Sequence, residues 1–146
     1  MIIKDNLFVK EIDIGNIKQC FAVIHQLRPH LSEQEYISLA KEMHTAGYKV
    51  FCLFEDKNIV AYAGVAILTN LYYGRHLWVY DLVSDKNRRG KGYGKILLDY
   101  LENFAHENGC SSVALSSGLQ RTDAHRFYEN KVKYQKISYV FKKDLC

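Results

Sequence analysis

The chain has 146 residues, 48% of them apolar and 25% charged, which is an ordinary globular composition. That length suits one compact domain, residues 1–146, and one proline and nine glycines leave little room for linkers or disordered tracts. The net charge of +4 is scattered except near residues 86–95, and a positive spot in one loop suits a small anion better than a long nucleic-acid backbone.

The first part of the chain predicts a strand and two helices. Residues 7–12 alternate partly, as a short strand does, and apolar residues then recur at helical spacing over 14–27 until Pro29. Ser32, followed three residues later by Glu35, predicts a capping box that opens a second helix. That helix is expected to end near Gly47 and to bury four residues, namely Tyr36, Leu39, Ala40 and Met43.

The remainder predicts a three-stranded meander followed by alternating helices and strands. The expected strands are 48–54, 59–71, 76–84, 112–116 and 134–141, and the expected helices are 93–108 and 123–130. The apolar stripe of the longer helix comprises Tyr93, Leu97, Tyr100, Leu101 and Phe104. This order predicts an α/β (α+β) fold with a mixed, mostly antiparallel central sheet and helices on both faces.

The four cysteines are far apart, with no C-x-x-C pair and no histidine at metal-ligand spacing, so we expect no metal. Cys52 and Cys110 lie in or beside apolar segments, which favours free thiols, although four cysteines could also pair as disulfides. The N-terminus lacks a signal-peptide pattern, and the longest apolar run, 59–68, is shorter than the roughly 20 residues that span a bilayer. We expect a cytoplasmic protein without a membrane partner.

The most informative stretch combines glycines and basic residues between a strand and a helix: Ser84-Asp85-Lys86-Asn87-Arg88-Arg89-Gly90-Lys91-Gly92-Tyr93-Gly94-Lys95. Alternating glycines let the backbone turn its N–H groups into one concavity, and the helix start adds unpaired donors and a positive dipole. The spacing fits neither the Rossmann fingerprint nor the P-loop. The pattern predicts a site for a phosphate-bearing ligand such as a pyrophosphate. The alternative is a turn whose basic side chains are merely solvated.

Arg89-Gly90-Lys91-Gly92-Tyr93-Gly94 resembles the [QR]-x-x-G-x-[GA] motif of the GNAT superfamily of N-acetyltransferases, and the predicted order of elements over 50–141 is also similar. Residues 80–83, 117–121 and 124–128 resemble a bacterial subgroup without a clear substrate. The resemblance implies one GNAT domain whose sheet splays between the fourth and fifth predicted strands. It implies acetyl-CoA as co-substrate and direct, ternary-complex transfer to a primary amine of a small molecule or peptide.

The resemblance also implies the residues that hold the cofactor. Its diphosphate would lie on the loop that Arg89 opens, against the amides of Gly90, Lys91, Gly92, Tyr93, Gly94 and Lys95. Its pantetheine arm would pair with the backbone of Leu82, Val83 and Ser84. Arg121 stands where many relatives have an asparagine that contacts the cofactor; it could also bind a substrate carboxylate or pair with Asp123.

Tyr128 matches the tyrosine that protonates the coenzyme A sulfur in relatives, and the alternative is a core aromatic. Ser116 replaces a carboxylate that many relatives use as the base. Asp81, acting through water, or His125 could take that role, although each could instead be structural. Ser117 and Gln120 are candidates for lining the pocket.

The resemblance places the acceptor near residues 27–32 and 72–73, without fixing its identity. The second hypothesis is a non-catalytic acyl-CoA sensor, motivated by Ser116, and the third is a nucleic-acid-binding module. A homodimer could form through the tyrosine-rich segment 134–141.

Overall fold

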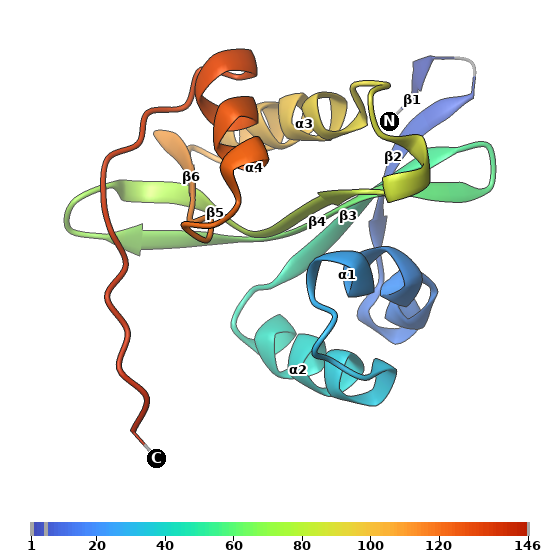
Figure 1. Ribbon diagram of the computed structural model, residues 1–146, viewed down its shortest axis with the longest axis horizontal. Coiled ribbons are helices and arrows are strands. Elements are labelled where there is room, and N and C mark those ends of the chain that lie inside the picture. The colour runs from blue at the N-terminus through green and yellow to red at the C-terminus, as the bar shows by residue number, and fades with distance from the viewer. Residues whose placement is uncertain (1, 5, 146) are drawn as a thin grey trace. The chain divides into compact units, whose positions relative to one another are not determined.

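The computed structural model describes residues 2–4 and 6–145, which fall into two compact units, Met1–Ala114 and Leu115–Cys146 (Figure 1). The first unit is built on a six-stranded sheet whose spatial order follows the chain, β1 to β6. Its strands are β1 (Ile2–Lys4), β2 (Leu7–Ile12), β3 (Lys49–Glu55), β4 (Asn58–Asn70), β5 (Gly74–Ser84) and β6 (Ser112–Leu115). Neighbouring strands from β1 to β5 pair antiparallel, as predicted for the meander.

The helices and helical turns are η1 (Ile14–Cys20), α1 (Phe21–Leu27), α2 (Glu33–Thr45), η2 (Lys86–Arg88), α3 (Tyr93–Glu107), α4 (Thr122–Arg126) and η3 (Phe127–Lys131). Helices α1 and α2 cover one face of the sheet and α3 the other (Figure 1), which confirms the predicted class. None of the helices in the described part of the chain is long and apolar enough to cross a membrane.

Helix α2 begins as its sequence predicts. The Glu35 N–H donates to Ser32 Oγ at 3.1 Å, and the Ser32 N–H donates to Glu35 Oε1 at 3.0 Å, which completes the capping box. Tyr36 and Ala40 are buried and Met43 is partly buried, whereas Leu39 is 47% exposed. The prediction that Leu39 is buried was wrong, because the buried face of this helix is narrower than the apolar stripe of its sequence.

The helix predicted over 14–27 is divided into two parts. A 3-10 helix runs from Ile14 to Cys20, and α1 follows from Phe21 to Leu27. Within the 3-10 helix, Asn16 also takes non-helical angles, φ −112° and ψ 15°. Apolar periodicity could not show the change from 3-10 helix to α-helix, since the two helix types differ mainly in hydrogen-bond spacing.

Helix α3 packs its apolar stripe on the other face of the sheet. Tyr93, Leu97 and Leu101 are buried as predicted, and Leu98 and Ala105 are buried beside them. Tyr100 and Phe104 are only partly buried, and both rings contact Phe51 of β3, with centroid distances of 5.4 and 5.0 Å. This packing fixes the helix that carries the glycine-rich loop at its start.

The C-terminal segment differs from its prediction. The helix expected over 123–130 is present as α4 and the π-helical turn η3, but residues 133–145 contain no regular secondary structure. Tyr139 and Phe141 are 73% and 93% exposed, so the strand predicted over 134–141 was wrong. Alternation of apolar and polar residues shows only that a segment could pack on a sheet. A strand also needs a neighbouring strand to pair with, which the local sequence does not reveal.

Cys20 and Cys52 are free thiols in the core beneath α1, with their Sγ atoms 3.7 Å apart. Cys110 is also free. Free thiols are therefore confirmed for the two cysteines for which they were predicted, Cys52 and Cys110, while Cys146 lies outside the described residues.

Candidate active site

The glycine-rich loop joins the end of β5 to the start of α3. Its first part is a short 3-10 turn, capped where Asp85 Oδ1 accepts the Asn87 N–H at 3.1 Å. Gly90 and Gly92 follow with φ of 87° and 77°, in the left-handed region that glycine adopts without steric cost. Two such residues, separated by Lys91, reverse the backbone over a very short distance.

The loop amides are unbonded. The first hydrogen bond of α3 is from the Ile96 N–H to the Gly92 carbonyl, at 3.0 Å. The N–H groups of residues 89–95 donate to no acceptor in the part of the chain that the structure describes. A Cβ built on Gly90 or Gly92 would meet no atom within 4 Å, so the space beside these amides is open. A row of free donors at a helix start is the arrangement that binds phosphate.

The basic side chains of the loop do not all face a ligand. Arg88 forms an ion pair with Glu55 of β3, and Lys95 pairs with Asp99 one turn along α3, at 2.9 Å. Arg89 and Lys91 form no ion pair among the described residues. Of the four basic side chains at 88, 89, 91 and 95, the fold therefore leaves Arg89 and Lys91 uncommitted.

Glu55 contacts both sides of the loop. Its carboxylate accepts hydrogen bonds from the Arg88 guanidinium and from the Tyr93 hydroxyl. The Tyr93 hydrogen bond, together with nearby Lys91 and Arg88, holds the pKa of Glu55 below its usual range. The same hydrogen bond raises the pKa of Tyr93.

The carboxyl end of β5 extends past the short strand beside it. β5 has eleven residues and β6 has four, and the Ser111 N–H just before β6 donates to the Arg75 carbonyl at 2.8 Å. A four-residue strand that starts near Arg75 cannot reach Leu82–Ser84 at about 3.3 Å per residue. One backbone edge of Leu82–Ser84 therefore lies beyond the reach of β6.

Asp81 lies on β5 beside a bulge. Gly64 of β4 pairs with Asp81, but Val65 pairs with Val79, so Tyr80 is the extra residue. The Tyr80 carbonyl accepts from a terminal nitrogen of Arg28 at 2.9 Å, and Asp81 Oδ1 accepts from Arg28 Nε at 3.0 Å. Arg28, in the predicted acceptor region after α1, is thus held by both residues.

The other Asp81 oxygen ends a chain of buried phenols. Tyr48 donates to Asp81 Oδ2 at 2.6 Å, and its oxygen lies 3.0 Å from the hydroxyl of Tyr62. Tyr62 in turn lies 2.9 Å from the hydroxyl of Tyr36. Each phenol has one proton, so Tyr62 must donate to Tyr48, and Tyr36 to Tyr62. Every donor of the chain points toward Asp81.

Burial of these phenols should make the stability of the protein depend on pH in the alkaline range. Burial is the main cause that raises the pKa of Tyr36, Tyr48 and Tyr62 above the ordinary phenol value. The contribution of these phenols to the free energy of unfolding is therefore constant below about pH 10 and falls above it, by up to about 1.4 kcal/mol per pH unit for each phenol. Urea unfolding at pH 8 and pH 11 measures this, and Tyr62→Phe should reduce the slope. A flat profile would contradict the assignment.

Gly64 leaves room for the hydrogen-bonded row of phenols. A Cβ at Gly64 would lie 1.8 Å from the Tyr48 hydroxyl oxygen, so Gly64→Ala must displace a buried ring. We expect the free energy of unfolding to fall by at least about 2 kcal/mol, from overpacking and lost hydrogen bonds. Gly15→Ala is the matched control, because no atom lies within 4 Å of its Cβ position. Equal stability of the two variants in denaturant titrations would refute this packing argument.

The second unit carries the remaining candidates. Tyr128 is 9% exposed, and burial raises its pKa, although hydrogen bonding with the Arg121 side chain opposes this. His125 Nε2 lies 2.9 Å from the Gly118 carbonyl oxygen. Since a carbonyl only accepts, Nε2 carries the proton, and the lone pair of the neutral ring is on Nδ1. Asp123 pairs with Arg126, so the alternative of an Arg121–Asp123 tie is not what the structure shows.

Ser116 and Ser117 follow β6. Ser116 is exposed, whereas the Ser117 hydroxyl is buried and has no hydrogen-bond partner among the described residues. In the first unit, Tyr72 is 78% exposed, and the neighbouring Tyr73 N–H donates to Asn70 Oδ1 at 2.7 Å. Within residues 2–4 and 6–145, no group of three or more His, Cys, Asp or Glu side chains could hold a metal ion.

Residues 17–134 match the family model described as "Acetyltransferase (GNAT) family". Over 126 residues, the chain is 40% identical to the uncharacterized N-acetyltransferase YhdJ of Bacillus subtilis (strain 168), which covers 86% of this chain and 89% of that protein. The chain belongs to the GNAT family. It is an N-acetyltransferase and uses acetyl-CoA as the acetyl donor.

Solved structures agree on the fold. The aminoglycoside N-acetyltransferase AAC(6')-Iy in complex with CoA superposes with a TM-score of 0.83 at 13% identity, covering 100% of both chains. A Trypanosoma brucei acetyltransferase has a TM-score of 0.75 at 24% identity, covering 95% of this chain and 99% of that one. At these identities the likeness supports the GNAT architecture alone.

The GNAT chain offers groups that fit coenzyme A. Unbonded amides at 89–95 suit a diphosphate, and the open edge of Leu82–Ser84 suits the amides of a pantetheine arm. When bound, acetyl-CoA supplies an activated thioester. Three partners in the site, Glu55, Arg28 and Tyr48, were not predicted from the sequence. Only Arg28 lay in a region that the sequence had marked, the predicted acceptor loop. Glu55 and Tyr48 act through contacts across the sheet, which the local sequence does not show.

Proposed function

We propose that this GNAT enzyme transfers an acetyl group directly from bound acetyl-CoA to a primary amine of a small molecule or peptide. The unbonded amides of residues 89–95 carry the proposal, because free donors at a helix start are suited to bind a diphosphate. Arg89 and Lys91 add charge there, and a Cβ built on Gly90 or Gly92 would meet no atom within 4 Å. Hydrogen bonds to charged groups contribute roughly 1.5–3 kcal/mol each, so several together hold the cofactor without a metal.

Direct transfer is favoured over an acetyl-enzyme intermediate on Cys20 or Cys52 by the burial of both thiols. Cys20 and Cys52 are each 0% exposed, and the pKa of the Cys52 thiol is raised by its contact with Cys20 and by burial. A buried, protonated thiol is a poor nucleophile. A ternary complex in which the amine attacks the thioester needs no such residue.

We assign the leaving-group proton to Tyr128. Burial raises the pKa of its phenol, which keeps the proton on oxygen at neutral pH and available for the departing sulfur. For the base, the geometry favours His125 over Asp81. The hydrogen bond to Gly118 leaves the lone pair on Nδ1 of a neutral His125, whereas both Asp81 oxygens already accept hydrogen bonds, from Arg28 and Tyr48.

The test is release of coenzyme A thiol from acetyl-CoA with a panel of amines, polyamines, aminoglycosides and peptides. Initial rates at several concentrations of both substrates should give intersecting double-reciprocal lines, and mass spectrometry should find no acetylated enzyme before amine is added. Parallel lines together with an acetylated protein would replace direct transfer by a two-step route.

A further inference from the structure

We propose that Glu55 is a positioning residue for the cofactor, because its carboxylate ties together the two ends of the phosphate loop through Arg88 and Tyr93. This inference rests on the proposed place of the diphosphate at residues 89–95. Glu55 would touch no phosphate itself. Its role would be to hold the loop in the shape that turns the amides into one concavity.

The backbone of Glu55 is a rigid base for this tie. As the last residue of β3, it pairs with Leu7 of β2 on one side and with Asn58 of β4 on the other. Its side chain is 18% exposed, so the carboxylate is largely withdrawn from water. A hydrogen bond from such a position orders its partners more strongly than one made by a freely moving surface chain.

The two partners lie on either side of the glycine-containing segment. Arg88 ends the 3-10 turn and Tyr93 begins α3, and the four residues between them include Gly90 and Gly92. Glycine has the largest conformational freedom of any residue, so an untied loop would sample many arrangements of its amides. Fixing both ends removes much of that freedom before the ligand binds, which is preorganisation.

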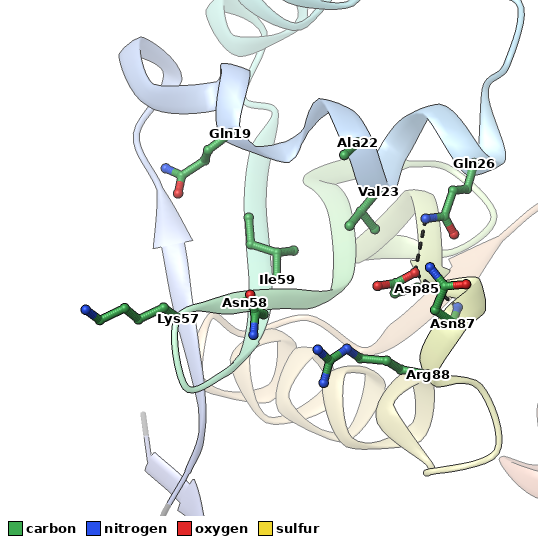
Figure 2. Close-up of a pocket in the computed structure, with 10 residues that line it drawn as sticks. All are labelled: Gln19, Ala22, Val23, Gln26, Lys57, Asn58, Ile59, Asp85, Asn87 and Arg88. Atoms are coloured by element: carbon green, nitrogen blue, oxygen red, sulfur yellow. Dashed lines mark hydrogen bonds between the residues drawn. The ribbon is translucent and has the colours of Figure 1, made fainter.

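A second set of contacts fixes the strand side of the loop only. Gln26 of α1 donates to Asp85 Oδ1 at 3.2 Å and accepts from the Lys86 N–H at 2.8 Å. Gln26, Asp85 and Arg88 line a pocket of about 400 Å³ (Figure 2). Figure 2 shows the Arg88 side chain extending from the loop toward the hairpin of residues 57–59. The helix side of the loop depends on the contact between Tyr93 and Glu55.

If only charge mattered, Glu55 would weaken cofactor binding rather than strengthen it. A carboxylate near a diphosphate repels it, and Glu55 also neutralises Arg88, which could otherwise bind phosphate. Removing the charge should therefore strengthen cofactor binding if electrostatics dominates, and weaken it if the loop shape dominates. The sign of the effect distinguishes the two.

The experiment compares Glu55→Gln and Tyr93→Phe with wild type, using acetyl-CoA and S-acetyl-pantetheine, which lacks the nucleotide and its diphosphate. We expect each variant to raise the KM for acetyl-CoA by about 5- to 30-fold, with kcat changed less than about twofold. Neither variant should change the KM for S-acetyl-pantetheine. Titration of CoA should show the same weakening in Kd. Glu42→Gln, at an exposed position on α2, is the matched control.

An unchanged or lower KM for acetyl-CoA in both variants would overturn the proposal, as would an equal rise in KM for both donors. Thermal unfolding checks that the variants are folded. If Glu55→Gln fails this check, Tyr93→Phe, which removes one hydroxyl, decides alone. Failure of the proposed diphosphate site is seen separately, because wild type itself would then not distinguish acetyl-CoA from S-acetyl-pantetheine.

Discussion

Tyr128→Phe should lower kcat about 10²–10⁴-fold, the usual contribution of a general acid. The substitution removes one oxygen and keeps the ring, which contacts Phe127 and Tyr134 at centroid distances of 5.4 and 6.3 Å. Burial raises the pKa of the Tyr128 phenol, so wild type carries the proton at neutral pH. Without it, the sulfur must leave as an unprotonated thiolate. Thiol release at saturating acetyl-CoA and amine measures the loss.

Tyr139→Phe is the matched control for that experiment, because Tyr139 is 73% exposed and lies in the segment without regular structure. Its kcat should equal that of wild type. CoA titration of Tyr128→Phe should also give the wild-type Kd, since the hydroxyl is assigned to proton transfer. An unchanged kcat in Tyr128→Phe would remove the acid role and leave Tyr128 as a core aromatic.

His125→Gln should lower kcat/KM about 10²–10⁴-fold at neutral pH if His125 accepts the amine proton. A base must be unprotonated, so wild-type kcat/KM should rise with pH on the acid side, and this rise should disappear in His125→Gln. Glutamine keeps a donor that can reach the Gly118 carbonyl, which in wild type accepts from Nε2 at 2.9 Å. The measurement is a pH profile of kcat/KM with one active amine.

Asp81→Asn is the companion variant. It keeps the shape of the side chain but removes the charge that pairs with Arg28, 3.0 Å away. We expect a smaller loss of rate and an acid-side rise in kcat/KM that persists. If Asp81→Asn removes that rise while His125→Gln leaves it, the base is Asp81 and the assignment must be exchanged.

Local features of the chain were predicted well because their physics is local. The capping box of Ser32 and Glu35 involves residues three apart, and both of its hydrogen bonds form. The positive φ values of Gly90 and Gly92 follow from a tight turn that other residues adopt only with strain. For the same reason the loop amides were identified from the sequence.

Contacts across the sheet were not predicted. Glu55 is 33 residues from Arg88 and 38 from Tyr93, and in the sequence it lies between the expected strands 48–54 and 59–71. Arg28 and Asp81 are 53 residues apart, and the bulge at Tyr80 that brings Arg28 to both residues depends on the register of β4 and β5. For residues 134–141 the error was the opposite one: a strand was predicted from a strand-like pattern, although no neighbouring strand was known to pair with it.

The most direct test of the central claim is a ¹⁵N–¹H correlation spectrum of the protein titrated with CoA and, separately, with pantetheine. We predict that the amide signals of residues 90–95 move most with CoA and only slightly with pantetheine, because the free N–H groups there take up the diphosphate. If CoA binds while those signals stay in place, the loop does not hold the diphosphate and the assignment of the site is wrong.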